Sequence, residues 1–151
     1  MTEGDLEGLD ATSAPDRLHV EAPAVESTFG LVHALLEHAW GVHPDVPPAC
    51  RARVETAVIE ILGNVVEHAF RHDPTTGRRL SLDLAVDARA VVAHLADNGQ
   101  PVELDLGHVE MPDELSESGR GLAMVNAVVD HLGYQRESGR NHWTVSCLRE
   151  R

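Results

Sequence analysis

Residues 59–70 read IEILGNVVEHAF, an apolar run interrupted by polar side chains at helical intervals. At about 100° per residue, Glu60, Asn64 and His68 fall within roughly 80° of one another and form one stripe along the helix. The adjoining arc is apolar and predicts the core face, which consists of Val54, Val58, Ile61, Leu62, Val65 and Ala69. A polar stripe of this kind is typical of the solvated side of an amphipathic helix. It is also a candidate site, because Gly63 in mid-helix costs about 1 kcal/mol relative to Ala and a purely structural helix has little reason to use it.

The residue types of the stripe suit metal binding and proton transfer. Glu60 and Asn64 place a carboxylate and a carboxamide one helical turn apart. Such a pair can hold Mg²⁺ through the amide oxygen while the neighbouring base takes a proton.

Two shorter motifs lie further along the chain. The stretch LADNG, residues 95–99, ends an expected strand with Asp97 and Gly99. A carboxylate there can accept a hydrogen bond from an exocyclic amine, and a glycine lets a flat ring approach the backbone. The stretch SGRGLAMV, residues 118–125, places two glycines where a helix begins, and free N–H groups at such an end favour a phosphate. Taken singly, the first motif is also typical of an Asn-Gly turn and the second of a flexible linker.

The composition excludes several classes of function. The 151-residue chain has a formal net charge of −13, which argues against direct binding of nucleic acid or of an anionic membrane. All twelve basic residues are arginines, whereas the P-loop and the protein-kinase site both need a lysine. No stretch approaches the roughly 18 apolar residues of a membrane span, and the acidic N-terminus is unlike a signal peptide, so a cytoplasmic protein is expected. Cys50 and Cys147 lack metal-binding or redox spacing and are expected to be reduced, Cys147 within a strand.

The pattern of apolar residues predicts an α+β fold. Residues 1–16 are expected to be a disordered acidic tail and residues 17–151 a single domain. The expected elements are strand 17–22, helix 26–41, helix 48–70, strand 80–87, strand 90–97, loop 98–118, helix 121–133, strand 134–138 and strand 142–148. Because strands and helices do not alternate one for one, we expect a two-layer α/β sandwich, with a mixed, mostly antiparallel sheet and three helices on one face.

The order of the three motifs carries a family resemblance. The motifs are Glu60-x-x-x-Asn64-x-x-x-His68, Asp97-x-Gly99 and Gly119-x-Gly121-Leu122. Together they resemble the N, G1 and G2 boxes of the GHKL ATPase superfamily. The forms VIEILGNVVEHAF and SGRGLAMVNAVVD are similar, more narrowly, to anti-sigma-factor serine kinases of the RsbW and SpoIIAB type. The resemblance covers about residues 17–149 and implies the Bergerat ATP-binding fold.

The resemblance implies a site for ATP and Mg²⁺. Asn64 would bind the Mg²⁺ that bridges the phosphates, and Glu60 would be the general base that acts on a serine hydroxyl of a partner protein. Asp97 would contact the adenine amino group, with Gly99 making space beneath the ring. His68 would lie near the phosphate or ribose.

The same resemblance implies a lid and a support for the adenine pocket. Gly119 and Gly121 would offer backbone donors to the phosphates, with Arg120 and Leu122 in the same motif. Thr144 in the last strand would support the adenine pocket. The implied partners are a sigma factor and an anti-anti-sigma protein, and the implied assembly is a homodimer, for which the strand at 17–22 is a possible edge.

Two departures from the family pattern leave other interpretations open. The stretch DNGQPVELD lacks a second glycine, and Glu117 and Ser118 stand where some relatives carry an arginine that reaches the terminal phosphate. The alternative is a non-catalytic module, with or without ATP, that only sequesters a regulator. A third interpretation is a zinc site at His68 and His72, four residues apart on a helix.

Overall fold

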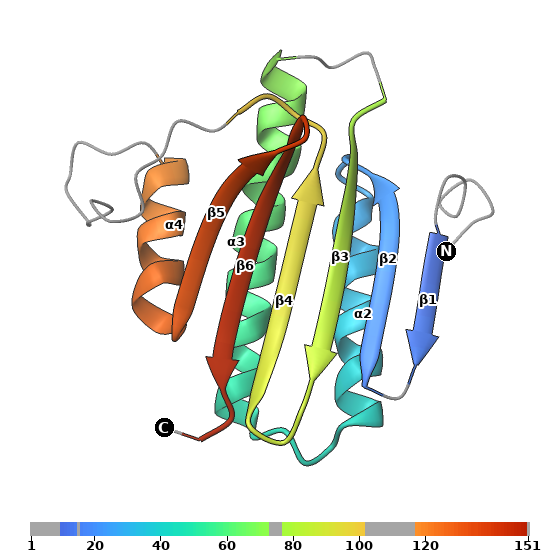
Figure 1. Cartoon of the computed structure of the whole chain (residues 1–151), viewed down its shortest axis with the longest axis vertical. Coiled ribbons are helices and arrows are strands. Elements are labelled where there is room, and N and C mark those ends of the chain that lie inside the picture. Colours follow the sequence, from blue (N-terminus) through green and yellow to red (C-terminus); the bar gives the residue numbers. More distant parts are fainter. Residues whose placement is uncertain (1–9, 15, 73–76, 102–116, 151) are drawn as a thin grey trace.

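The computed structural model describes residues 10–14, 16–72, 77–101 and 117–150. Six strands form one sheet in the order β1-β2-β3-β4-β6-β5, and three helices lie against one face of it (Figure 1). The strands are β1 (Asp10–Ala14), β2 (Arg17–Pro23), β3 (Arg79–Val86), β4 (Ala90–Asp97), β5 (His131–Glu137) and β6 (Arg140–Leu148). The helices are α2 (Thr28–Val42), α3 (Pro48–His72) and α4 (Glu117–Val128). The predicted two-layer α/β sandwich is confirmed.

The described strand pairs are all antiparallel, whereas the sequence predicts a partly mixed sheet. For β1–β2, β3–β4 and β5–β6 the physical reason is a tight turn, because a short turn can join only antiparallel neighbours. In the β3–β4 turn, Asp87 Oδ1 accepts the N–H groups of Arg89 and Ala90 at 2.7 and 2.8 Å, and these bonds lower the pKa of Asp87. In the β5–β6 turn, Ser138 and Gly139 have φ values of 53° and 75°, which is typical of a two-residue hairpin turn.

Helix α3 is the centre of the hydrophobic core. Its buried residues are Cys50, Val54, Ala57, Val58, Ile61, Leu62, Val65 and Val66. These include the predicted core face except Ala69, whose side chain lies outside the described part. Cys50 and Cys147 are both buried and form no disulfide, and Cys147 lies within β6 as expected. Burial raises the pKa of the Cys50 thiol. No described helix is long and apolar enough to cross a membrane.

Alternation along the strands assigns each side chain to one face of the sheet. On β4, every second residue from Val91 to Asp97 is buried on the side of the helices. The face away from the described helices, here called the open face, carries His94 of β4 and His142 of β6, whose ring nitrogens are 3.1 Å apart. The side chains of two consecutive residues of a strand therefore lie on opposite faces of the sheet and cannot belong to one site.

Strand β1 differs from the predicted tail. Residues 10–14 pair antiparallel with β2, with Asp10 opposite Glu21 and Ala14 opposite Arg17. The unpaired backbone groups at the edge of β2 can hydrogen-bond a polar segment whatever its side chains are. The composition of residues 10–14 therefore does not indicate this pairing. Residues 1–9 lie outside the described part. The strand at residues 17–22 was predicted as a possible edge of the sheet. It is β2, and it lies inside the sheet between β1 and β3.

Helix α4 and strand β5 divide the segment that the sequence predicts as one helix, 121–133. The helix begins earlier, at Glu117, and residues 131–133 already belong to β5. The reason is tertiary: the N–H of Asp130 donates to the carbonyl of Ser146 in β6 at 3.0 Å, which directs the chain into the sheet. Helical periodicity in the sequence does not report such a contact.

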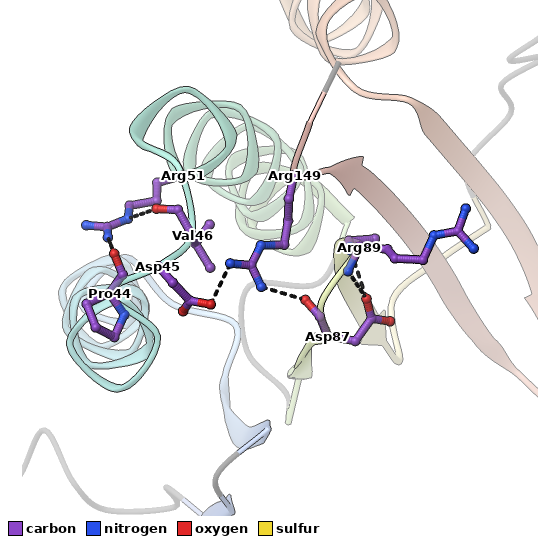
Figure 2. A network of polar contacts seen from close by, with 8 residues as sticks. Pro44, Asp45, Val46, Arg51, Asp87, Arg89 and Arg149 are labelled. Atoms are coloured by element: carbon purple, nitrogen blue, oxygen red, sulfur yellow. Dashed lines mark hydrogen bonds and ion pairs between the residues drawn. The ribbon is translucent and has the colours of Figure 1, made fainter.

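Arg149 lies at the end of the sheet opposite the carboxyl end of β4, here called the far end, and binds two loops there (Figure 2). Its Nη2 donates to Asp45 Oδ2 at 2.7 Å, between α2 and α3, and its Nη1 to the carbonyl of Asp87 at 2.9 Å. Arg51 holds the same α2–α3 connection through two backbone carbonyls. The hydrogen bond from Arg149 is the main cause that lowers the pKa of Asp45 below its ordinary value of 3.8. Three chain segments that are distant in sequence are thus joined at this end.

Candidate active site

Glu60 and Gly121 come from different helices and lie in contact. Glu60 is half-buried on α3, and Gly121 lies one turn inside α4. A methyl group in place of the Gly121 hydrogen would overlap Oε2 of Glu60 and lie 3.3 Å from its Cδ. Only glycine lets α4 approach the carboxylate this closely. The fold therefore brings the first and third sequence motifs together.

Asn64 lies one turn beyond Glu60 on the same helix and is also half-buried. Its Nδ2 donates to the backbone carbonyl of Glu60 at 2.9 Å. Because the helix backbone engages the amide nitrogen, the amide oxygen is the group left for a ligand. An amide oxygen beside a carboxylate is chemically suited to Mg²⁺, so these two residues fit that ion.

Asp97 ends β4 on the side of the helices and is 5% exposed. Its Oδ1 accepts the N–H of Gly99 at 2.8 Å and Nδ2 of Asn141 at 2.9 Å. Two donors on one oxygen fix the carboxylate and leave Oδ2 as the acceptor for a ligand. Gly99 thus has a contact that the sequence does not indicate, in addition to the predicted space beneath a ring.

Asn141 is the site residue that sequence reasoning missed. It is 1% exposed, lies opposite Asp97 in the β4–β6 register, and is contacted by Arg136 Nη1 at 3.1 Å. The sequence assigned residues 139–141 to a turn, whereas the turn residues are Ser138 and Gly139. A glycine preceded by a serine is the signal that could have placed the turn earlier and Asn141 inside the strand.

Thr144 does not lie in the site. It alternates with the buried residues Trp143 and Val145 of β6, so its side chain is on the open face. There it lines a hollow of about 340 Å³ together with His94 and His142. Its predicted support of the adenine pocket is therefore corrected: the thickness of the sheet separates it from Asp97, and the residue of β6 that contacts Asp97 is Asn141.

The glycine motif lies inside α4 and not ahead of it. Because α4 begins at Glu117, Gly119 falls in the first turn, whose N–H groups are free of helical partners, and Gly121 in the second. Gly121 therefore provides close approach to Glu60, and the N–H groups without helical partners belong to the first turn. Leu122 is 4% exposed and packs in the hydrophobic core, which corrects its predicted place among nucleotide contacts.

Some predictions fall on side chains that lie outside the described part. These are the roles of His68 and Arg120 and the alternative zinc site at His68 and His72. Among the side chains that are described, no group of three His, Cys, Asp or Glu is placed to hold a metal ion.

Comparison with known proteins identifies relatives of nearly the same length. Residues 25–147 match the histidine kinase-like ATPase domain. The serine/threonine-protein kinase BtrW of Bordetella bronchiseptica is 28% identical over 142 residues, 89% of this chain and 94% of the relative. The serine-protein kinase RsbW of Halalkalibacterium halodurans is 31% identical over 137 residues, 83% of this chain and 79% of the relative. The enzyme class predicted from the sequence is the class of both relatives.

A solved structure supports the fold. The crystal structure of the RsbU and RsbW domains of Rv1364c from Mycobacterium tuberculosis matches with a TM-score of 0.59 and 24% identity. The match covers 87% of this chain and 32% of that chain, so the chain spans about a third of it. At this identity the comparison confirms the predicted architecture alone.

Proposed function

Because the chain belongs to the histidine kinase-like ATPase family, with RsbW-type serine kinases as its relatives, we propose that it is an ATP-dependent serine/threonine protein kinase that acts as an anti-sigma factor. In this proposal it sequesters a sigma factor and phosphorylates a serine or threonine of an anti-anti-sigma protein. The proposed assembly is a homodimer.

The contact between Glu60 and Gly121 carries the proposal. It sets a half-buried carboxylate against the second turn of α4, so a candidate base lies close to the free N–H groups of the preceding turn. A helix N-terminus favours phosphate, and a positioned carboxylate can accept a proton from a hydroxyl. This contact supports the proposal because it brings a candidate base close to a candidate phosphate site.

Each residue has a distinct proposed task. Asp97 accepts a hydrogen bond from the adenine amine through Oδ2, and Asn64 holds Mg²⁺ through its amide oxygen. The ion supplies positive charge to the phosphates when bound. Glu60 takes the proton of the substrate hydroxyl as that oxygen attacks the terminal phosphorus and the bond to ADP breaks. Positioning and charge neutralisation supply most of the catalysis in such a reaction.

Titration calorimetry with ATP, with and without Mg²⁺, tests the binding half of the proposal. We expect Asp97→Ala to weaken ATP binding about tenfold or more, because a charged hydrogen-bond acceptor is lost. Asn64→Ala should remove the dependence on Mg²⁺. Asp83→Ala is the matched control, since Asp83 lies on the neighbouring strand and contacts His19 on the open face. If the wild type binds no ATP, the kinase proposal fails and the sequestering module is the better interpretation.

Transfer of labelled phosphate from ATP to an anti-anti-sigma protein tests the catalytic half. Glu60→Gln is expected to slow transfer about a hundredfold or more while ATP affinity is retained, because the amide cannot take a proton. Glu67→Gln removes an exposed carboxylate from the same helix and should leave the rate unchanged. Full activity of Glu60→Gln would exclude the general-base role.

A further inference from the structure

Asn141 is buried with its full hydrogen-bonding capacity in use. Its Nδ2 donates to Asp97 Oδ1 at 2.9 Å and to the carbonyl of Gln100 at 2.8 Å. Its Oδ1 accepts the hydroxyl of Tyr134 and Nη1 of Arg136, the latter at 3.1 Å. An asparagine side chain has two N–H donors and two acceptor lone pairs, so these contacts engage all four. Because the residue is only 1% exposed, such a satisfied network holds the amide rigidly.

The surroundings admit one orientation of this amide. A rotation by about 180° would turn Nδ2 toward the guanidinium of Arg136, where donor would meet donor. It would also turn Oδ1 toward the carboxylate of Asp97 and the carbonyl of Gln100, where acceptor would meet acceptor. Asn141 therefore presents its amide N–H group, and never its oxygen, to Asp97.

The turn that follows Asp97 is held from both sides. Arg136 Nη1 donates to the carbonyl of Gly99 at 2.7 Å, and the N–H of Gly99 donates to Asp97 Oδ1 at 2.8 Å. Asn141 holds the carbonyl of the next residue, Gln100. The carboxylate and the turn are thus positioned as one unit, in which Oδ1 of Asp97 is fully occupied and Oδ2 is directed elsewhere.

We propose that Asn141 is a positioning residue that makes the site selective for adenine, by holding Asp97 so that only Oδ2 meets the base. The proposal rests on the proposed role of Asp97. Adenine presents an amine at position 6, which a carboxylate oxygen attracts, whereas hypoxanthine presents a carbonyl oxygen there, which it repels. Without Asn141 the carboxylate can rotate, and the discrimination between the two bases falls.

The experiment compares binding of ATP and of inosine triphosphate, both with Mg²⁺, by titration calorimetry. Asn141→Ala is expected to weaken ATP binding about tenfold and inosine triphosphate binding much less, so the ratio of the two affinities falls. Tyr134→Phe keeps the ring beside Trp143, with centroids 4.6 Å apart, and removes only the hydroxyl that holds Asn141. It should lower the ratio about twofold to threefold. Thr144→Ala, on the same strand and the opposite face, is the control and should keep the wild-type ratio.

The ratio separates positioning from a general structural role. A loss of structure weakens both nucleotides alike, so an unchanged ratio in Asn141→Ala and Tyr134→Phe overturns the inference even if both affinities fall. If circular dichroism shows that Asn141→Ala does not fold, the ratio of Tyr134→Phe decides. A wild-type protein that binds ATP no better than inosine triphosphate refutes the role of Asp97 instead, so the two failures are distinguishable.

Discussion

The two ends of the sheet both use arginine and aspartate, yet they differ in burial. At the site end, Asp97 and Asn141 are 5% and 1% exposed, and Asn141 contacts both Asp97 and Arg136. At the far end, Arg149 meets Asp45, whose side chain is 70% exposed (Figure 2). An exposed ion pair is screened by water and contributes little, whereas buried polar groups are costly unless fully paired. The far end joins loops, and the site end holds functional groups in a fixed orientation.

The two tryptophans are both buried but differ in hydrogen bonding. Trp40, in α2 and next to the far end, donates its indole N–H to Glu55 Oε1 at 2.7 Å. Trp143, two residues from Asn141 in β6, is 1% exposed, and its indole N–H has no hydrogen-bond partner among the described residues. An unpaired buried donor costs about 1–3 kcal/mol. The packing of Trp143 in the core must offset this cost at the site end.

Among the variants that compare the two ends of the sheet, the largest effect is expected from Gly121→Ala, which tests whether the site end tolerates a displacement of Glu60 or of α4. The added methyl group overlaps Oε2 of Glu60, so the carboxylate must rotate or α4 must move away. We expect phosphate transfer to fall about tenfold to a hundredfold, with less change in ATP affinity. Gly41→Ala in α2, where a methyl group meets nothing within 4 Å, is the control for transfer assays. A wild-type rate in Gly121→Ala would mean that phosphate transfer does not depend on the close approach of α4 to Glu60.

An intermediate effect is expected from Gly63→Ala on α3, between the two candidate ligands Glu60 and Asn64. A methyl group there would lie 3.9 Å from the ring of Phe29, an ordinary contact. Alanine should therefore raise the stability by about 0.5–1 kcal/mol, because glycine is a poor helix former, and raise the unfolding midpoint by about 1–4 °C. Thermal unfolding and ATP titration of the same variant are the measurements. A loss of ATP affinity would show that Gly63 belongs to the site. A lower unfolding midpoint would show that the added methyl group does not fit at this position.

The smallest effect is expected at the far end, from Asp45→Asn. The pKa of Asp45 is lowered in the folded state, mainly by the hydrogen bond from Arg149. Its carboxylate therefore contributes stability above the ordinary pKa of 3.8 and loses that contribution as the pH falls through the folded value. In thermal unfolding, the midpoint of the variant should be slightly lower than that of the wild type at neutral pH. In strong acid the two midpoints should be equal. A fall in ATP affinity comparable to that of Asp97→Ala would show that the two ends are not independent.

The parts of the site that were predicted are those that local periodicity reports. Glu60 and Asn64 share a helix face because of the 3.6-residue turn, and Asp97 follows from the alternation and end of one strand. Asn141 was missed because the sequence places the turn at residues 139–141, which leaves Asn141 outside the last strand. Thr144 was assigned from the family resemblance, and the alternation of β6 places its side chain on the other face of the sheet. Leu122 was misassigned because a motif position does not tell which side of a helix packs on the core.

The sequence by itself determined the α+β class, the absence of lysine-based phosphate sites, the core face of α3 and the three motifs that mark the family. Only the tertiary structure decided that Gly121 meets Glu60, that Asn141 holds Asp97 and that β1 extends the sheet. Periodicity is a property of neighbouring residues along the backbone, and a sequence displays it directly. Strand register and helix contact depend on how the whole core packs, so they become visible only when the chain is folded.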